Sequence, residues 1–485
     1  MTPAASVDAK ARVSLRAAPA PLAAVAMAAL AATGPIGAGL ATALLLSSAI
    51  LLLDWVGTLG IFALRPAVDC FWSLRIFPGG DRMWNLQSIV GVLVPVALVW
   101  NLLLRRRRIW WTDVTLWFVL YLISSAIGTL LFTAGTQSGA DLLRIALPFA
   151  FFLVAFEQSR RGGSLLVPAF LLSLYAFLPA VTGLLQLLGI LTPPEGAVTT
   201  AAHWVVRISG LYHHPYEIAM RCAVSIPFGL MLGDHLPTPG TRRTMRLWVM
   251  GLVLIGFATL LRTTLVAITV ELFVWFWLVG KRALAGILVG LPLLILPLVG
   301  PVRTVILEAV RPLTSGAWYE LGTGRAVLFA AQVAAFHQGT PLEKLVGRGL
   351  HSAPDITERF SPLEKIQTGQ STFGEGNRGA HNQFLRVLDE SGVVGLIAIT
   401  GVIVCAVRAC VRGMKREGVE DVERAFARST LTMLIAFLVM CLSFQPFDQP
   451  ATTWPLWLAL GLVAGRAAKT EPRRVSRMTL EPAVA

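Results

Sequence analysis

The stretch RRRRIWWTDVTLWFVLYLISSAIGTLLFT, residues 105–133, places a run of arginines directly before a long apolar segment. The segment from Val114 to Thr133 holds no charged residue and has the length, roughly 20 residues, at which an α-helix crosses a bilayer. Similar segments recur along the 485-residue chain, of which 55% is hydrophobic and only 14% is charged. The sequence therefore predicts an all-α polytopic integral membrane protein rather than a soluble enzyme with an anchor.

The predicted spans cover most of the chain, and about twelve transmembrane helices fit the pattern best. Several segments are shorter than a bilayer requires, so their ends are expected to extend into the flanking residues. The first 64 residues add one or three crossings, with a break near Gly34-Pro35. The other spans are 86–104, 114–133, 142–156, 165–191, 211–232, 247–261, 265–279, 284–302, 393–410, 431–444 and 453–463.

Basic residues gather on alternate connections between these spans. Cytoplasmic loops of membrane proteins collect Lys and Arg, so these connections and both termini are predicted to be cytoplasmic. The same rule explains the net charge of +14 without nucleic acid as a partner. The basic clusters are Arg105–Arg108, Arg160-Arg161, Arg242–Arg246, Lys281-Arg282, residues 408–428 and the tail after Arg466.

One connection is far too long for a turn between two spans. Residues 303–390 follow the N-terminal transmembrane helices at 1–302 and precede the C-terminal transmembrane helices at 391–466 and a basic tail at 467–485. Loops longer than about 15 residues are usually functional or disordered. Because this loop contains helix-compatible stretches such as RAVLFAAQVAAFH, we expect short, half-embedded helices on the outer side that cover a cavity.

Three arginines fall on the outer side, where basic residues are not expected. Arg207 opens RISGLYHHP and precedes His213 and His214, Arg262 lies in the turn LLRTTLV, and Arg325 lies at a predicted helix start in GTGRAVLF. Such arginines either contact lipid headgroups or bind a phosphorylated substrate. Adjacent histidines diverge and no acidic cluster lies nearby, so neither a metal nor another cofactor is predicted.

The polar stretch RGAHNQFLRVLDESGVVGL, residues 378–396, leads directly into a predicted span. Its pattern predicts a short amphipathic helix that Ser391-Gly392 ends, with Asn382 capping the helix start and His381 sharing a face with Leu385. The positive end of a helix favours the neutral imidazole, which can act as a base. A lone histidine is more often structural, but His381 shares its compartment with the three arginines, which favours a catalytic role.

These motifs together resemble the O-antigen ligase and polymerase superfamily. His381-Asn382, nine residues and then the sequence GVVG at 392–395 is similar to the family's H[NSQ]-x9-G-x-x-G signature, and Arg207-x3-Leu211 is similar to its other outer-face signature. GTGR, followed by LVGRGL at 345–350, resembles the family's large-loop pattern. Arg262 falls where such proteins often have a Ser-Arg pair, although Leu261 replaces the serine here.

The resemblance implies a GT-C-type, metal-independent glycosyltransferase in a bacterial inner membrane, with its active site facing the periplasm. The donor would be an undecaprenyl-diphosphate-linked glycan and the acceptor lipid A–core. His381, Arg207 and Arg325 would be catalytic, because a hydroxyl nucleophile needs a base and a diphosphate leaving group needs cations. Arg262, His214 and Asn382 would bind the diphosphate or lie near it.

Three functions remain open from the sequence. The first is an O-antigen ligase. The second, an O-antigen polymerase or a protein O-oligosaccharyltransferase, uses the same donor and differs only in the acceptor, so the motifs do not separate the two. The third is a lipid or glycan transporter, which should show internal repeats and a midplane site; no repeat is evident and the polar residues gather at the outer face.

Overall fold

The computed structural model describes residues 53–70, 86–104, 111–133, 135–194, 207–295, 325–360 and 381–469, together with residues 48, 50, 298, 303 and 307. These described residues are 82% helical and include no β-strand. The all-α prediction is therefore confirmed for the described part of the chain. The predicted break near Gly34-Pro35 lies outside the described residues.

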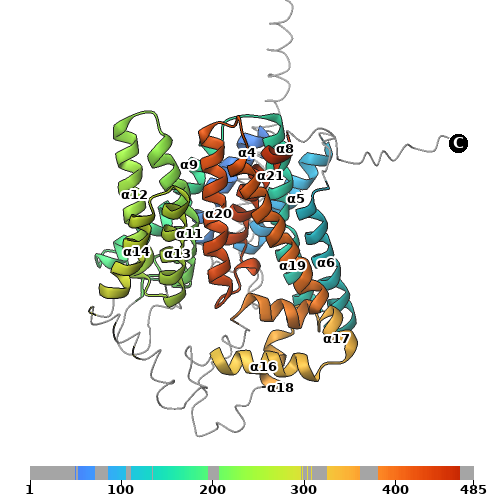
Figure 1. The fold of residues 1–485 in the computed structure, drawn as a ribbon. Coiled ribbons are helices and arrows are strands. Elements are labelled where there is room, and N and C mark those ends of the chain that lie inside the picture. The colour runs from blue at the N-terminus through green and yellow to red at the C-terminus, as the bar shows by residue number, and fades with distance from the viewer. Residues whose placement is uncertain are drawn as a thin grey trace, which may run out of the picture.

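Helices make up most of the described chain (Figure 1). Their bounds are α4 Trp55–Asp69, α5 Leu86–Leu104, α6 Asp113–Phe132, α7 Thr136–Ala146, α8 Phe149–Arg161, α9 Leu166–Leu174, α10 Phe177–Leu187, α11 Pro215–His235, α12 Pro239–Ala258, α13 Arg262–Leu278, α14 Arg282–Ile295, α16 Arg325–Gln338, α17 Pro341–Val346, α18 Ala353–Phe360, α19 Gln383–Lys415, α20 Asp421–Cys441, the 3₁₀ turn η5 Pro446–Asp448 and α21 Pro450–Ala468.

Five helical segments among the described residues are long and apolar enough to cross a membrane: Asp113–Phe132, Gln137–Arg161, Leu166–Leu187, Gln383–Lys415 and Asp421–Cys441. Backbone N–H and C=O groups have no water to bind in a bilayer, so helices, which satisfy these groups internally, are what such apolar sequences form. The structure is accordingly that of an α-helical, multi-pass membrane protein.

Two predicted spans, 142–156 and 165–191, correspond to the membrane-length segments Gln137–Arg161 and Leu166–Leu187, and the helix is interrupted once inside each segment. The span at 142–156 breaks before α8 at Pro148, which has no N–H to donate to a preceding helical turn. The span at 165–191 breaks between α9 and α10, where the Ala176 N–H donates to Ser225 Oγ (3.1 Å) and Ser225 Oγ donates to the Leu172 carbonyl (2.9 Å). A side chain from another helix replaces the missing intrahelical bonds there.

The predicted span at 211–232 begins too early, because α11 starts at Pro215. Gly210 has φ 59°, a left-handed conformation that favours glycine, and a Cβ at this position would lie 2.5 Å from Thr182 Oγ1. The residues around Gly210 therefore form a tight turn against α10 before the helix can begin.

The helices form a bundle with α11–α14 on one side, α20 and α21 in the middle, and α5, α6 and α19 on the other side (Figure 1).

Glycines allow the closest contacts between helices. A Cβ on Gly461 or Gly465 of α21 would lie within 2.5 Å of the Phe152 or Phe156 carbonyl oxygen of α8, so only glycine permits this approach. Small residues spaced four apart are typical of helix pairs in membranes.

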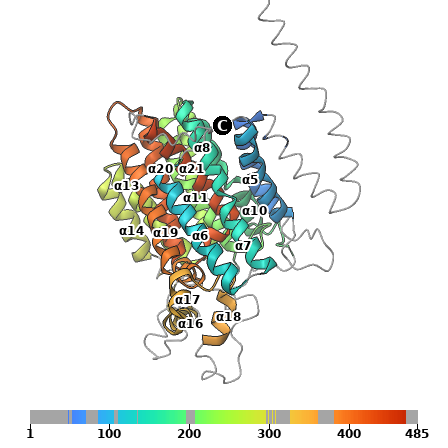
Figure 2. The ribbon, with the colours of Figure 1, turned by 90° about the vertical axis from the view of Figure 1, so that its right-hand side faces the viewer.

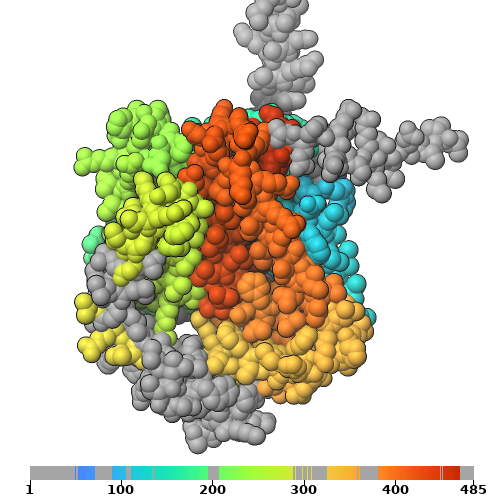
Figure 3. Space-filling model, in the orientation of Figure 1, coloured from blue at the N-terminus to red at the C-terminus, as the bar shows by residue number. Residues whose placement is uncertain are grey.

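The helices α16, α17 and α18 lie together beyond one end of the bundle, which we name the loop end (Figures 1 and 2). In the space-filling view their surface is continuous with that of α19 (Figure 3). The opposite end, which we name the basic end, contains the ends of α8, α19 and α21 with Arg161, Lys415 and Arg466.

The loop helices are fixed to the bundle at a break in α19. Gly392 has φ 68° and ψ −171°, so the helix is interrupted at the predicted Ser391-Gly392 position. The interruption leaves carbonyl groups free, and the N–H groups of Arg348 and Gly349 donate to the Asp389 and Glu390 carbonyls (2.7 and 3.0 Å). The LVGRGL sequence at 345–350 thus holds the segment of α19 before the break at the loop end.

Candidate functional site

Four helices begin at the loop end around one short turn. The turn is Leu442–Gln445, which joins α20 to η5 and is named here the α20–η5 turn. Thr263, in the first turn of α13, forms a hydrogen bond with Ser443, and Asn382, at the start of α19, donates to the Leu442 carbonyl (3.1 Å). The turn therefore connects the starts of two helices that are distant in sequence.

The ring of Phe444 connects the other two helix starts to the same turn. The Arg325 guanidinium, at the first residue of α16, lies 5.4 Å from the centre of the Phe444 ring. Tyr216, in the first turn of α11, stacks on this ring at 5.6 Å. Each helix N-terminus carries partial positive charge, so the convergence of α11, α13, α16 and α19 creates an electropositive environment before any side chain is considered.

His214 caps α11 through its ring nitrogen Nδ1, which acts as a hydrogen-bond acceptor. Its Nδ1 accepts from the Tyr216 N–H (3.1 Å), so the ring proton of the neutral form is on Nε2. Burial, followed by the positive charges of His213, Arg207, His381 and Arg325, lowers the pKa of His214 to about 4. This dependence on Arg207, Arg325 and His381 shows that the structure brings these groups close to His214.

The positive charges of the arginines also lower each other's pKa. Burial lowers the pKa of Arg207, with the charge of Arg262 as the second cause. Burial also lowers the pKa of Arg325, with Arg262 and then Arg207 as further causes. Like charges are therefore gathered in a partly buried space, which is unfavourable unless an anion joins them.

Neither Arg207 nor Arg325 forms an ion pair with any other described residue. The Nε atom of Arg207 is buried and has no hydrogen-bond partner in the described structure. The backbone around Arg207 is fixed by Gln186 of α10, whose side chain donates to the Arg207 carbonyl (3.3 Å) and accepts from the Ser209 and Gly210 N–H groups (2.9 and 2.7 Å). The backbone at Arg207 is thus fixed, and its Nε has no acceptor among the described residues, which fits an anion site.

His381 lies outside the helix that was predicted to contain it. Helix α19 begins at Gln383, and His381 has φ 47°, so the expected shared face with Leu385 is wrong. The reason is the N-cap: Asn382 Oδ1 accepts from the Phe384 and Leu385 N–H groups (3.0 Å each), so the helix begins after Asn382 and excludes His381. A non-glycine residue with positive φ is uncommon, and such strain is often found at functional sites.

The first turns of α11 are anchored by buried charges. Arg221 pairs with Asp69 of α4 and lies 3.3 Å from Glu217 Oε2, and Arg65 Nε lies 2.8 Å from Asp69 Oδ1. Arg65, Asp69 and Arg221 are at most 1% exposed. Breaking one partner of such a buried network is costly, so it fixes the position of α11 and of His214 at its start.

The structure therefore brings the six residues singled out from the sequence together at the loop end. We name them the cation cluster: Arg207, His214, Arg262, Arg325, His381 and Asn382.

Sequence reasoning missed the α20–η5 turn and Gln186. In the sequence, the turn was indicated only by the polar and aromatic connection SFQPFDQ, which lies on the same predicted side as the arginines. Among the described residues, no three His, Cys, Asp or Glu side chains are grouped to hold a metal ion.

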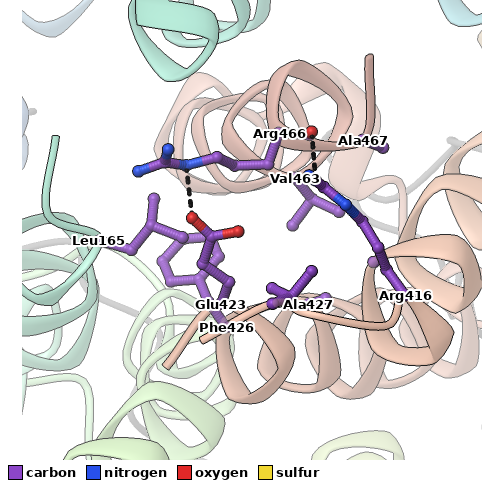
Figure 4. A pocket seen from close by; sticks show the side chains of 10 residues that line it. Leu165, Arg416, Glu423, Phe426, Ala427, Val463, Arg466 and Ala467 are labelled. Carbon is purple, nitrogen blue, oxygen red and sulfur yellow. Dashed lines mark hydrogen bonds and ion pairs between the residues drawn. The ribbon is translucent and has the colours of Figure 1, made fainter. Parts of the chain in front are cut away.

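A small pocket lies at the basic end, between the ends of α19, α20 and α21 (Figure 4). Its charged groups already have partners, because Arg466 forms an ion pair with Glu423 (Nε to Oε1, 3.2 Å) and Arg416 donates to the Arg466 carbonyl (2.9 Å). It includes no residue of the cation cluster and is separate from it.

Comparison with known proteins gives no further assignment, because no protein-family model and no curated sequence matches this chain.

Proposed function

We propose that this protein is an O-antigen ligase, a metal-independent inverting glycosyltransferase that moves a glycan from undecaprenyl diphosphate to a sugar hydroxyl of lipid A–core. The observation that supports the proposal most strongly is the cation cluster, in which three arginines, two histidines and four helix N-termini meet. A polyprenyl diphosphate leaving group is an anion that such a site would stabilise. The motif resemblance supports the same assignment independently of the geometry.

In this proposal Arg207, Arg325 and Arg262 bind the diphosphate and stabilise the charge that develops on it as the glycosidic bond breaks. Guanidinium groups hold phosphate oxygens through paired hydrogen bonds, which is how they replace a divalent metal. His214 adds a hydrogen bond from Nε2, because its Nδ1 is occupied as an acceptor. Its role is therefore to bind the donor and not to remove a proton.

His381 is the proposed base. It removes the proton from the acceptor hydroxyl as that oxygen attacks the anomeric carbon, and the bond from this carbon to the diphosphate oxygen breaks. Attack from the side opposite the leaving group inverts the configuration at this carbon. Asn382 holds the backbone of His381 between α19 and the α20–η5 turn.

The membrane setting belongs to the same proposal. About twelve spans of GT-C type would place the basic end in the cytoplasm and the loop end in the periplasm of a bacterial inner membrane. Membrane lipids surround the apolar helices, and the lipid-linked donor would approach the cation cluster from the outer leaflet.

Reconstitution tests the proposal and separates it from the alternatives. Purified protein in liposomes is supplied with an undecaprenyl-diphosphate-linked glycan and either lipid A–core or a second lipid-linked glycan. A ligase yields glycosylated lipid A–core, whereas a polymerase yields a lengthened lipid-linked glycan. Movement of the glycan lipid between leaflets without any new glycosidic bond would refute the transferase proposal in favour of a transporter.

A further inference from the structure

Helix α17 exposes an apolar face at the loop end. Leu342 and Leu345 are three residues apart, so they lie on the same side of this short helix, and they are 49% and 51% exposed. Val346, which follows Leu345, is buried. Helix α17 therefore has one side on the protein and one side, formed by Leu342 and Leu345, that faces away from it. We name this pair the α17 apolar face.

The position of α17 is fixed by close contacts with α6 and α19, which are both long and apolar enough to cross a membrane. A Cβ on Gly128 of α6 would lie 2.5 Å from the Val346 carbonyl oxygen. A Cβ on Gly392, at the break in α19, would lie 2.3 Å from the Leu345 carbonyl oxygen. Only glycine permits such approaches, so α17 lies at a defined height along both helices (Figures 1 and 2).

This height matches the edge of a bilayer on the loop-end side. Helix α6 rises about 22 Å from its first residue, Asp113, to Gly128. Along α19 the distance from Gly392 to Arg412, near the basic end, is about 30 Å. The hydrocarbon core of a bilayer is about 30 Å thick. A bilayer that begins where these two helices meet the basic end therefore reaches the level of α17.

The α17 apolar face continues the apolar surfaces of the two helices beside it. Ile127 and Leu131 are exposed in the last turns of α6, and Val393 and Ile397 are exposed in the first turns of α19 after the break. In a multi-pass membrane protein such side chains are covered by lipid. An exposed apolar surface that joins them at the same height marks a further membrane contact.

We infer that α17 lies in the membrane interface, with Leu342 and Leu345 inserted among the lipid acyl chains of the leaflet on the loop-end side. A helix that lies flat in this region buries its apolar side and keeps its polar side at the level of the headgroups. The contact holds the loop helices against the membrane surface. It would be made by a transporter as well as by a transferase, because it uses no residue of the cation cluster.

Nitroxide labels on introduced cysteines measure the depth of this face in the full-length protein, held in nanodiscs of phosphatidylcholine and phosphatidylglycerol. The test variants are Leu342→Cys and Leu345→Cys, which both change exposed side chains. Ile397→Cys on α19 is the control for a position in lipid, and Asp355→Cys on α18 is the control for an exposed position on a loop helix. Labelled wild-type protein gives the background from the five native cysteines, four of which are buried.

We expect the labels at positions 342 and 345 to collide more often with oxygen, which dissolves in lipid, than with a water-soluble nickel complex. Their depth should be about 5–10 Å into the boundary between headgroups and acyl chains. The label at position 397 should lie deeper, and the label at position 355 should prefer the nickel complex. The same preference for nickel at 342 and 345, in variants that unfold at the wild-type temperature, would overturn the inference. Protection from both reagents would also overturn it, because a second copy of the chain or another protein would then cover the α17 apolar face.

Discussion

Substitutions of Asn382 can separate its two roles, as the cap of α19 and as a tether to the α20–η5 turn. Its Oδ1 accepts from the Phe384 and Leu385 N–H groups, and its Nδ2 donates to the Leu442 carbonyl (3.1 Å). Asn382→Ser keeps a side-chain oxygen for the cap but has no amide to reach Leu442. Asn382→Ala removes both interactions.

The expected magnitudes follow from these bonds. Serine caps a helix about as well as asparagine, so Asn382→Ser loses only the tether, a net contribution of about 1 kcal/mol. Asn382→Ala loses in addition a cap of about 1 kcal/mol. If the tether positions His381 for proton removal, its loss slows transfer by about fivefold, the rate equivalent of about 1 kcal/mol, in Asn382→Ser.

The assay compares thermal unfolding in detergent with kcat and KM for transfer, measured per folded protein. The matched control is Thr112→Ala, which removes the cap of α6 (Thr115 N–H to Thr112 Oγ1, 3.1 Å) and lies outside the cation cluster. It should lower stability by about 1 kcal/mol and leave kcat unchanged. A wild-type kcat for Asn382→Ser, with only stability reduced, would refute the positioning role of the tether.

The remaining predictions concern topology, metals, the arginines and pH. A cysteine introduced as Asp355→Cys should react with an impermeant thiol reagent from the outside and one introduced as Glu417→Cys should not; the reverse pattern would place the cation cluster in the cytoplasm. EDTA should leave transfer by the purified protein intact, and activity that required added Mg²⁺ or Mn²⁺ would contradict arginine-only stabilisation. Arg207→Ala and Arg325→Ala should weaken donor use severely, with poor rescue by lysine, whereas near-normal transfer would return these residues to a lipid-contact role. Because burial lowers the pKa of His214 to about 4 from 6.5, the stability from its neutral form should be lost as the pH falls from about 6.5 to 4, and His214→Asn should show a smaller loss of thermal stability over this range than wild type.

Much of the membrane architecture was predictable because the bilayer imposes length and apolarity on every span. The predicted segment 86–104 has the same bounds as α5, and α6 differs from 114–133 by one residue at each end. The break at Ser391-Gly392 was also predictable, since a glycine after a serine in a helical pattern indicates an interruption. These features depend on local sequence and on the bilayer alone.

Tertiary features of the fold were not predictable from local pattern. The break between α9 and α10 depends on Ser225, which lies on α11 and replaces bonds that the local sequence would otherwise form. The late start of α11 depends on the contact of Gly210 with Thr182. No periodicity within one segment contains this information.

The candidate site likewise combines residues that were predictable from the sequence with contacts that were not. Its charged residues were found because arginines on the outer side of a membrane protein contradict the usual charge distribution. Their connection through Ser443 and Phe444 was missed, because that turn comes from the far end of the chain and its contacts with Thr263, Asn382 and Arg325 exist only in the folded protein. The close approach of Gly347 to the break in α19, which fixes the loop helices, was missed for the same reason, because it exists only in the folded protein.

The most direct test of a catalytic His381 is one purified His381→Ala sample on which donor affinity, thermal stability and transfer rate are all measured. Loss of a general base typically costs about 10²- to 10⁴-fold in rate. If His381 removes the acceptor proton, the transfer rate falls by this factor or below detection, while donor affinity and the unfolding temperature stay near wild type. Transfer at the wild-type rate by the folded variant, or a loss of activity that only follows a loss of folded protein, would contradict the proposed mechanism.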